Sequence, residues 1–230
     1  MQQKGMNMTE QTSGATRRHN YIKTKEVIYK TMMKMLREDT YENLTVRNIA
    51  ETAGISIGTF YHYFNGKDEL LSYYLRKVFD IDTVREEVAA DGDIKAELLR
   101  VYEIYLGYFK EAGVEYISNF YNSRNQYLNT RRRIGQADVI QDQAAALVME
   151  LLIAAQYNGY IPLDTDVEDT TNDLCVITKG VVMDWCLNQG NTDIIAYIRK
   201  MIGIYIDSLL TPAYHQRFSK RSSLLDGQER

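Results

Sequence analysis

The sequence predicts an all-α protein built from two helical parts. Apolar residues recur at helical spacing along most of the 230 residues, only two prolines interrupt the chain, and no run of alternating apolar and polar residues predicts a strand. Hydrophobic residues make up 45% of the chain, which is enough for a sizeable core. We expect a three-helix unit at 21–66 and a larger helical unit at 67–211, between a flexible arm at 1–20 and a flexible tail at 212–230.

The first helix is expected at 24–39, where one apolar stripe would brace two shorter helices. The stripe consists of Val27, Ile28, Thr31, Met32, Met35 and Leu36. Arg17, Arg18 and Lys23 lie at the start of this helix or just before it. Such a basic arm either reaches DNA or remains solvated, and the residues leave both alternatives open.

Two short helices are predicted on either side of Gly54. The hydroxyl of Thr45 can accept a hydrogen bond from the unpaired N–H groups at the start of a helix over 46–53. Gly54 then suits the left-handed conformation that ends a helix. Ser56 offers a second N-cap, and 57–64 is long enough for about two turns. This spacing predicts a helix-turn-helix.

The second of these helices has two unlike faces. Phe60 and Phe64 are four residues apart and are predicted to pack in the core. Four aromatic rings cannot all be buried on a two-turn helix, so Tyr61 and Tyr63 are expected to face outward and to bond DNA phosphates. His62 is either a groove contact or a neutral surface side chain, and no cluster of cysteine or carboxylate ligands near it indicates a metal site.

These residues resemble the TetR (tetracycline-repressor-like) family of bacterial transcriptional regulators over roughly 21–75. The matching motifs are Ile49-Ala50-Glu51-Thr52-Ala53-Gly54, Ile55-Ser56, Tyr61-His62-Tyr63-Phe64 and Lys67-Asp68-Glu69-Leu70. Many members have a polar or charged residue where this chain has Ile57, whose side chain would either touch a thymine methyl group or pack. We expect the DNA contacts to come from Thr45, Arg47, Ser56, Ile57, Gly58, Thr59, Tyr61, His62, Tyr63 and Lys67.

The charge is distributed unevenly along the chain. Residues 17–77 carry 11 Lys and Arg against 7 Asp and Glu, whereas residues 78–230 carry 15 against 23. The net charge of −4 therefore combines a basic N-terminal part with an acidic remainder. The basic part suits double-stranded DNA as a partner, and the acidic remainder does not.

The second unit is expected to contain only helices. A long helix is predicted from Lys67 to about Val88, and the final helix is expected to stop before Pro212. Between them we expect helices at 94–112, 114–127, 136–158, 167–189 and 192–210. The family resemblance implies a homodimer in which the last two of these form a four-helix bundle with their counterparts. We expect the interface to contain Val181, Ile194, Ile198, Ile202 and Ile206.

The acidic unit is rich in aromatic residues, which either line a ligand pocket or pack helix against helix. The resemblance implies a small-molecule effector bound in this unit. The candidate ligand-binding residues are Tyr102, Tyr105, Phe109, Phe120, Tyr121, Met183 and Trp185. Cys175 and Cys186 lie 11 residues apart on one expected helix, too far apart for a disulfide, and are expected to be reduced thiols.

These features predict a ligand-responsive transcriptional regulator, most simply a repressor that binds a palindromic operator as a dimer and is released by an effector. A DNA-bound adaptor controlled by a protein partner remains an alternative. A helical enzyme is disfavoured because the acidic unit has a single histidine, His215, and no nucleophile with a base. We expect no cofactor, no metal and no membrane span, since the apolar run at 144–155 is short, and we expect a cytoplasmic location, since 1–16 lacks an export signal.

Overall fold

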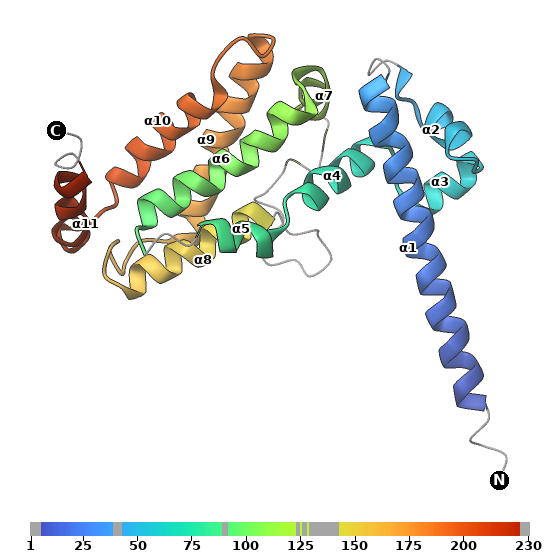
Figure 1. The fold of residues 1–230 in the computed structure, drawn as a ribbon, viewed down its shortest axis with the longest axis horizontal. Coiled ribbons are helices and arrows are strands. Elements are labelled where there is room, and N and C mark those ends of the chain that lie inside the picture. The colour runs from blue at the N-terminus through green and yellow to red at the C-terminus, as the bar shows by residue number, and fades with distance from the viewer. Residues whose placement is uncertain are drawn as a thin grey trace. The chain divides into compact units, whose positions relative to one another are not determined.

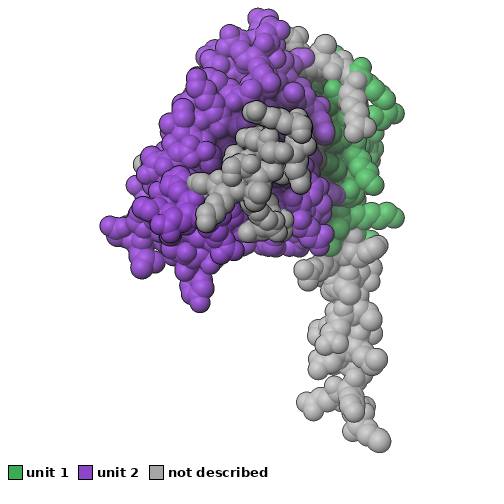
Figure 2. Space-filling model, turned by 60° about the vertical axis from the view of Figure 1, so that its left-hand side comes forward, with its two compact units in different colours: residues 1–74 green, residues 75–230 purple. Residues whose placement is uncertain are grey.

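The computed structural model describes residues 6–38, 43–88, 92–122, 125, 128 and 143–225. These residues form eleven helices and no strand, so the all-α fold class is confirmed (Figure 1). The chain divides into two compact units, residues 1–74 and residues 75–230 (Figure 2).

Unit 1 begins with α1 (Met6–Glu38), which is far longer than the expected 24–39. The expected start at Thr24 is wrong, because no proline lies before it and a formed helix extends at little cost over residues that tolerate helical geometry. Ile28 and Met32 are fully buried, as expected, and α1 packs against α2. Val27 is exposed, so its predicted place in the core stripe is also wrong.

The helix-turn-helix consists of α2 (Val46–Thr52) and α3 (Ile57–Tyr63), which pack against each other. Thr45 and Ser56 are the N-caps of these helices, as predicted. Gly54 adopts a φ of +68°, the left-handed value at which other residues are strained. Its backbone N–H bonds the carbonyl of Glu51 at 3.1 Å, which closes α2.

The predicted helix from Lys67 to Val88 is interrupted, and this prediction is wrong. The structure has α4 (Lys67–Val78) and α5 (Ile81–Val88). Phe79 is buried between them and packs edge-on against Tyr105, 5.6 Å between ring centroids. The carboxylate of Asp80 then accepts a 2.8 Å bond from the hydroxyl of Thr83, and the backbone carbonyl of Asp80 accepts a 2.9 Å bond from the N–H of Val84, the first bond of the new helix. Burial of Phe79 and capping by Asp80 together outweigh continuity of the helix.

Unit 2 is organised around α6 (Ile94–Ala112), which contacts α5, α7 (Val114–Phe120), α8 (Gln143–Tyr157) and α10 (Ile194–Asp207) (Figure 1). The buried face of α6 carries Ile94, Leu98, Val101, Tyr102, Leu106 and Phe109. The expected extension of α7 to Tyr127 is wrong, because the carbonyl of Phe120 bonds the side chain of Asn125 at 2.8 Å instead of continuing the helix. The expected start of α8 at Gln136 lies outside the described residues.

The last two long helices are α9 (Val167–Leu187) and α10 (Ile194–Asp207), as predicted to within three residues. They pack against each other, and α10 also packs along α6. Two ion pairs hold α10 to α6: Arg199 with Glu103, and Lys95 with Asp207, each with a closest N–O distance of 2.6 Å. The predicted helical hairpin is therefore present.

The residues expected at the dimer interface lie in the core of their own unit. Val181, Ile194, Ile198, Ile202 and Ile206 are at most 4% exposed within the single chain. A side chain that has no surface left cannot contribute buried area to a second subunit, so this assignment is wrong. Periodicity correctly identified an apolar face of each helix, but it was the face that packs inward.

The expected flexible tail contains a helix, α11 (Pro212–Leu225). Pro212 does not only stop the preceding helix; it is the first residue of the next one, a position at which proline needs no N–H partner. Tyr214 and Phe218 are buried, and the Tyr214 hydroxyl donates to the Asp93 carboxylate at 2.6 Å. No described helix of either unit is both long and apolar enough to span a bilayer.

Candidate nucleic-acid interface

Helix α3 presents one buried face and one open face, as the sequence predicts. Phe60 is fully buried, and Phe64, which follows the helix, is 1% exposed. On the other side Ile57 is 46% exposed and Tyr61 is 53% exposed. Gly58 and His62 are exposed as well. The phenylalanines thus hold α3 to its unit while the opposite side remains accessible.

Side-chain caps fix the starts of both short helices. The Ser56 hydroxyl accepts a 2.9 Å bond from the backbone N–H of Thr59 and lies 2.8 Å from the Thr59 hydroxyl. The Thr45 hydroxyl accepts a 3.1 Å bond from the backbone N–H of Asn48. Each cap satisfies a donor that the helix itself cannot pair. A helix of two turns depends on such a cap to keep its first residues ordered.

Two basic candidates, Arg47 and Lys67, are held differently. Arg47 lies on the surface of α2 and forms an ion pair with Glu51 at 3.1 Å. Such an exposed pair is weak, so a phosphate can compete for the guanidinium. Lys67 is half-buried at the start of α4. Desolvation lowers the pKa of its ammonium group, and the attraction of Asp68 offsets only part of that effect.

Tyr63 differs from the other outward candidates because α1 covers it in part. Its ring packs on that of Tyr21, 4.7 Å between centroids, and Tyr21 also meets His62 edge-on at 6.1 Å. Lys25, one turn further along α1, lies over the rings of Phe64 and Tyr73 at 4.9 and 4.8 Å. These contacts brace α3 against α1.

Sequence reasoning did not identify Tyr21 and Lys25 as part of this site. They share a helical stripe with the buried Ile28 and Met32, at spacings of three or four residues. That spacing was a usable signal. Tyr21 was missed because the first helix was expected to begin at Thr24, after Tyr21, and Lys25 was missed because only the apolar residues of that helix were considered.

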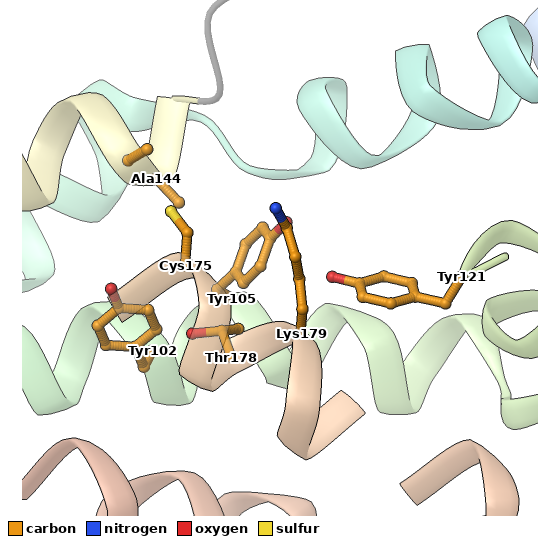
Figure 3. A pocket seen from close by; sticks show the side chains of 8 residues that line it. Tyr102, Tyr105, Tyr121, Ala144, Cys175, Thr178 and Lys179 are labelled. Carbon is orange, nitrogen blue, oxygen red and sulfur yellow. The ribbon is translucent and has the colours of Figure 1, made fainter. Parts of the chain in front are cut away.

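A small cavity with a volume of about 30 Å³ lies within unit 2. Tyr102 and Tyr105 of α6 face Cys175, Thr178 and Lys179 of α9 across it (Figure 3). Tyr121, Ala144 and Ala145 complete the lining. The walls combine aromatic surface with hydroxyl, thiol and ammonium groups, which is the mixture that binds small amphipathic molecules.

The cavity brings together three of the seven predicted ligand-binding residues: Tyr102, Tyr105 and Tyr121. The other four are not in its lining. Phe109 is fully buried between Tyr105 and Tyr121, and its ring centroid lies 4.7 and 5.7 Å from the centroids of these two rings. Phe120 and Trp185 are buried, and Met183 is on the exposed side of α9. Sequence reasoning missed Cys175, Thr178 and Lys179, although their spacing of three and four residues on one helix was visible.

Both cysteines are on α9, as expected, and both are free thiols. Burial raises the pKa of the Cys186 thiol, and a hydrogen bond with Ser118 offsets only part of that rise. A thiol with a raised pKa is a poor nucleophile at neutral pH. Among the described residues, no three His, Cys, Asp or Glu side chains gather in a group that could hold a metal ion.

The arrangement of α1, α2 and α3, with an exposed recognition face on a capped short helix, defines a helix-turn-helix DNA-binding protein. The sequence profile described as "Bacterial regulatory proteins, tetR family" matches residues 28–74. This match, together with the regulators described next, supports a ligand-responsive DNA-binding transcriptional regulator of the TetR type.

Similar proteins extend this relationship over most of the chain. The HTH-type transcriptional repressor KstR2 of Rhodococcus jostii is 26% identical over 170 residues, which are 73% of this chain and 82% of the repressor. Among solved structures, a TetR transcription regulator from Haloarcula marismortui superposes with a TM-score of 0.53 and 20% identity over 82% of this chain and 99% of its own. The transcriptional regulator FadR from Bacillus subtilis, solved with stearoyl-CoA, gives a TM-score of 0.51 and 19% identity over 79% of this chain and 97% of its own.

Proposed function

We propose that this protein is a dimeric repressor whose two α3 helices read the halves of a palindromic operator, and that a small-molecule effector releases it. The observation that carries this proposal is the open face of α3, where Ile57 and Tyr61 are about half exposed on a helix that Ser56 caps and Phe60 anchors. The N-terminal residues of such a helix contact base edges in the major groove. Tyr61 is assigned a bond to a phosphate, and Arg47 and Lys67 supply further charge.

A dimer follows from the small size of the reading surface. One helix of seven residues makes few base contacts, whereas two such helices spaced about 34 Å apart enter successive major grooves. The exposed apolar side chains of α9 and α10 provide a surface for the second subunit. They are Val176, Met183 and Leu187 on α9 and Tyr197 and Ile204 on α10. They take the place of the five buried residues first assigned to the interface.

The cavity between α6, α8 and α9 is the proposed effector site. Its volume of about 30 Å³ is close to that of one water molecule and far below the ~300–1,000 Å³ that ligand pockets occupy, so an effector would have to widen the cavity when it binds. An effector that binds more tightly to the conformation with low DNA affinity must, by linkage, weaken DNA binding by the same factor. Helix α4 includes the boundary at residues 74 and 75 and so connects the two units covalently.

Selection of bound fragments from a pool of random double-stranded DNA tests the proposal. We expect the full-length protein to recover a palindrome whose half-sites are about one helical turn apart, centre to centre. A triple variant in which Ile57, Gly58 and Tyr61 are changed to Ala should recover no common sequence. Recovery of a non-palindromic site, or of the same palindrome by the variant, contradicts the proposed reading by paired α3 helices.

Effector release is tested on the duplex recovered above. A panel of small amphipathic molecules, lauroyl-CoA and stearoyl-CoA among them, is screened for compounds that raise the melting temperature of the protein and displace the duplex. Changing Thr178 to Val keeps the shape of the cavity wall and removes a hydroxyl. We expect this variant to bind the duplex normally and to respond less to a polar effector. A protein partner that alone causes release would favour the adaptor alternative.

A further inference from the structure

Ile57 is an apolar side chain that lies partly exposed on the open face of α3. It is the first residue of α3, and 46% of it is exposed. The attachment of α3 to its unit comes from Phe60 and Phe64, which are at most 1% exposed. A single exposed aliphatic side chain is common on protein surfaces, so it is the position of Ile57 on the open face of α3, and not its exposure alone, that indicates a contact.

The backbone around Ile57 is fixed, so its side chain is presented in a defined direction. Ser56 caps the helix by accepting a bond from the backbone N–H of Thr59 at 2.9 Å. Gly58, the next residue, has no side chain that would keep a partner away from Ile57. Tyr61 is one turn further along the same face and is 53% exposed. Ile57 and Tyr61 therefore form adjacent parts of one accessible surface.

The chemistry of an isoleucine side chain limits what it can recognise on DNA. It has no hydrogen-bond donor or acceptor, so it cannot bond a phosphate or the polar atoms of a base edge. In the major groove the one apolar group on an unmodified base is the C5 methyl of thymine. We infer that Ile57 is a specificity-determining residue that selects thymine at one position of each half-site by packing on this methyl group. The inference rests on the proposed entry of α3 into the major groove.

Replacing thymine by deoxyuridine tests this contact, because the change removes the methyl group and leaves every hydrogen-bonding atom of the base pair in place. The duplex is the palindrome recovered by selection with the wild-type protein. Each thymine is replaced in turn, symmetrically in both half-sites, and affinity is measured by fluorescence anisotropy for wild type, Ile57→Ala and Ile153→Ala. Ile153 is 53% exposed on α8 of unit 2 and serves as the matched control.

We expect one symmetric replacement to weaken wild-type binding by roughly fifteenfold. This is about fourfold for each half-site, because each half-site loses one methyl group from an apolar contact. Ile153→Ala should show the same loss. Ile57→Ala should bind the thymine and deoxyuridine duplexes equally, within about twofold. A second selection with Ile57→Arg should recover a G·C pair in place of thymine at that position, since arginine pairs with guanine.

Three results would overturn the inference while leaving the proposed operator binding intact. The first is a wild-type affinity that no thymine replacement changes. The second is an equal loss of affinity in wild type and in Ile57→Ala. The third is recovery of the same T·A pair by Ile57→Arg. If the wild-type protein selects no sequence at all, the proposed reading of DNA by α3 fails, and the role of Ile57 fails with it.

Discussion

Gly54 and Gly58 are four residues apart in unit 1, and the same change to alanine should affect stability in opposite directions. Gly54 has a φ of +68°, and an added Cβ would meet no atom within 4 Å. Gly58 is helical, and its added Cβ would lie 3.7 Å from the Ser56 hydroxyl oxygen, an ordinary contact. Steric crowding is therefore small at both sites, and backbone conformation alone decides the sign.

The expected magnitudes follow from that difference. The left-handed conformation costs alanine about 1–2 kcal/mol, of which about 0.4–1 kcal/mol is offset because alanine also restricts the unfolded chain. Gly54→Ala should thus destabilise the protein by roughly 0.5–1 kcal/mol. In a helix interior alanine is favoured over glycine by about 1 kcal/mol, so Gly58→Ala should be stabilising by up to that amount.

Urea unfolding of the full-length variants, followed by far-ultraviolet circular dichroism, measures both changes. We expect the urea concentration at the midpoint of unfolding to fall for Gly54→Ala and to rise or stay unchanged for Gly58→Ala. The dependence of the free energy of unfolding on urea concentration should be similar in both variants. Equal shifts in one direction would refute the argument that the left-handed turn at Gly54 sets the geometry of the helix pair. Operator binding by the stable Gly58→Ala variant should still be weaker, because its methyl group obstructs close approach to DNA.

Three further outcomes are expected. Ser56→Ala should lower the free energy of unfolding, measured in urea, by about 1 kcal/mol. It should also weaken operator binding more than the control Thr83→Ala, which removes a hydroxyl from unit 2. Ile204→Asp, at a site 61% exposed, should remain folded but sediment as a monomer, with its melting temperature lowered only by the loss of dimerisation. Ile198→Asp, at a fully buried site, should melt far below Ile204→Asp. A dimeric Ile204→Asp protein would contradict the revised interface. Burial, and secondarily the bond to Asp173, raises the pKa of Tyr205 to about 12 from 10.0, so the stability that this shift contributes is complete below about pH 10 and is lost as the pH rises to about 12. Urea unfolding over this range should show a shallower decline in the free energy of unfolding for Tyr205→Phe than for wild type. An identical decline in the two proteins would contradict this expectation.

The helix-turn-helix was predictable because its determinants are local. The caps at Thr45 and Ser56 and the left-handed turn at Gly54 each depend on residues within four positions, and all three are present as predicted. The separation of Phe60 from Tyr61 follows from helical geometry. A short sequence can determine these features without reference to the rest of the chain.

The errors concern contacts between residues distant in the sequence. Both α9 and α10 carry apolar residues on more than one face, so periodicity could not decide that Ile198 packs inward while Ile204 lies at the surface. The break at Phe79 depends on packing against Tyr105, and the helical tail depends on Tyr214 reaching Asp93. In each case a tertiary contact overrides the local preference, and no local pattern reports it.

The central claim is that the open face of α3 binds the operator, and the affinity of Tyr61→Ala tests it most directly. Tyr157→Ala is the control, because Tyr157 is 92% exposed on α8 and lies in the other unit. Loss of one hydrogen bond per half-site predicts that Tyr61→Ala binds the selected palindrome about tenfold more weakly or worse, with an unchanged melting temperature. Tyr157→Ala should bind it as wild type does. Equal affinities for Tyr61→Ala, Tyr157→Ala and wild type would contradict the assignment of α3 as the recognition helix.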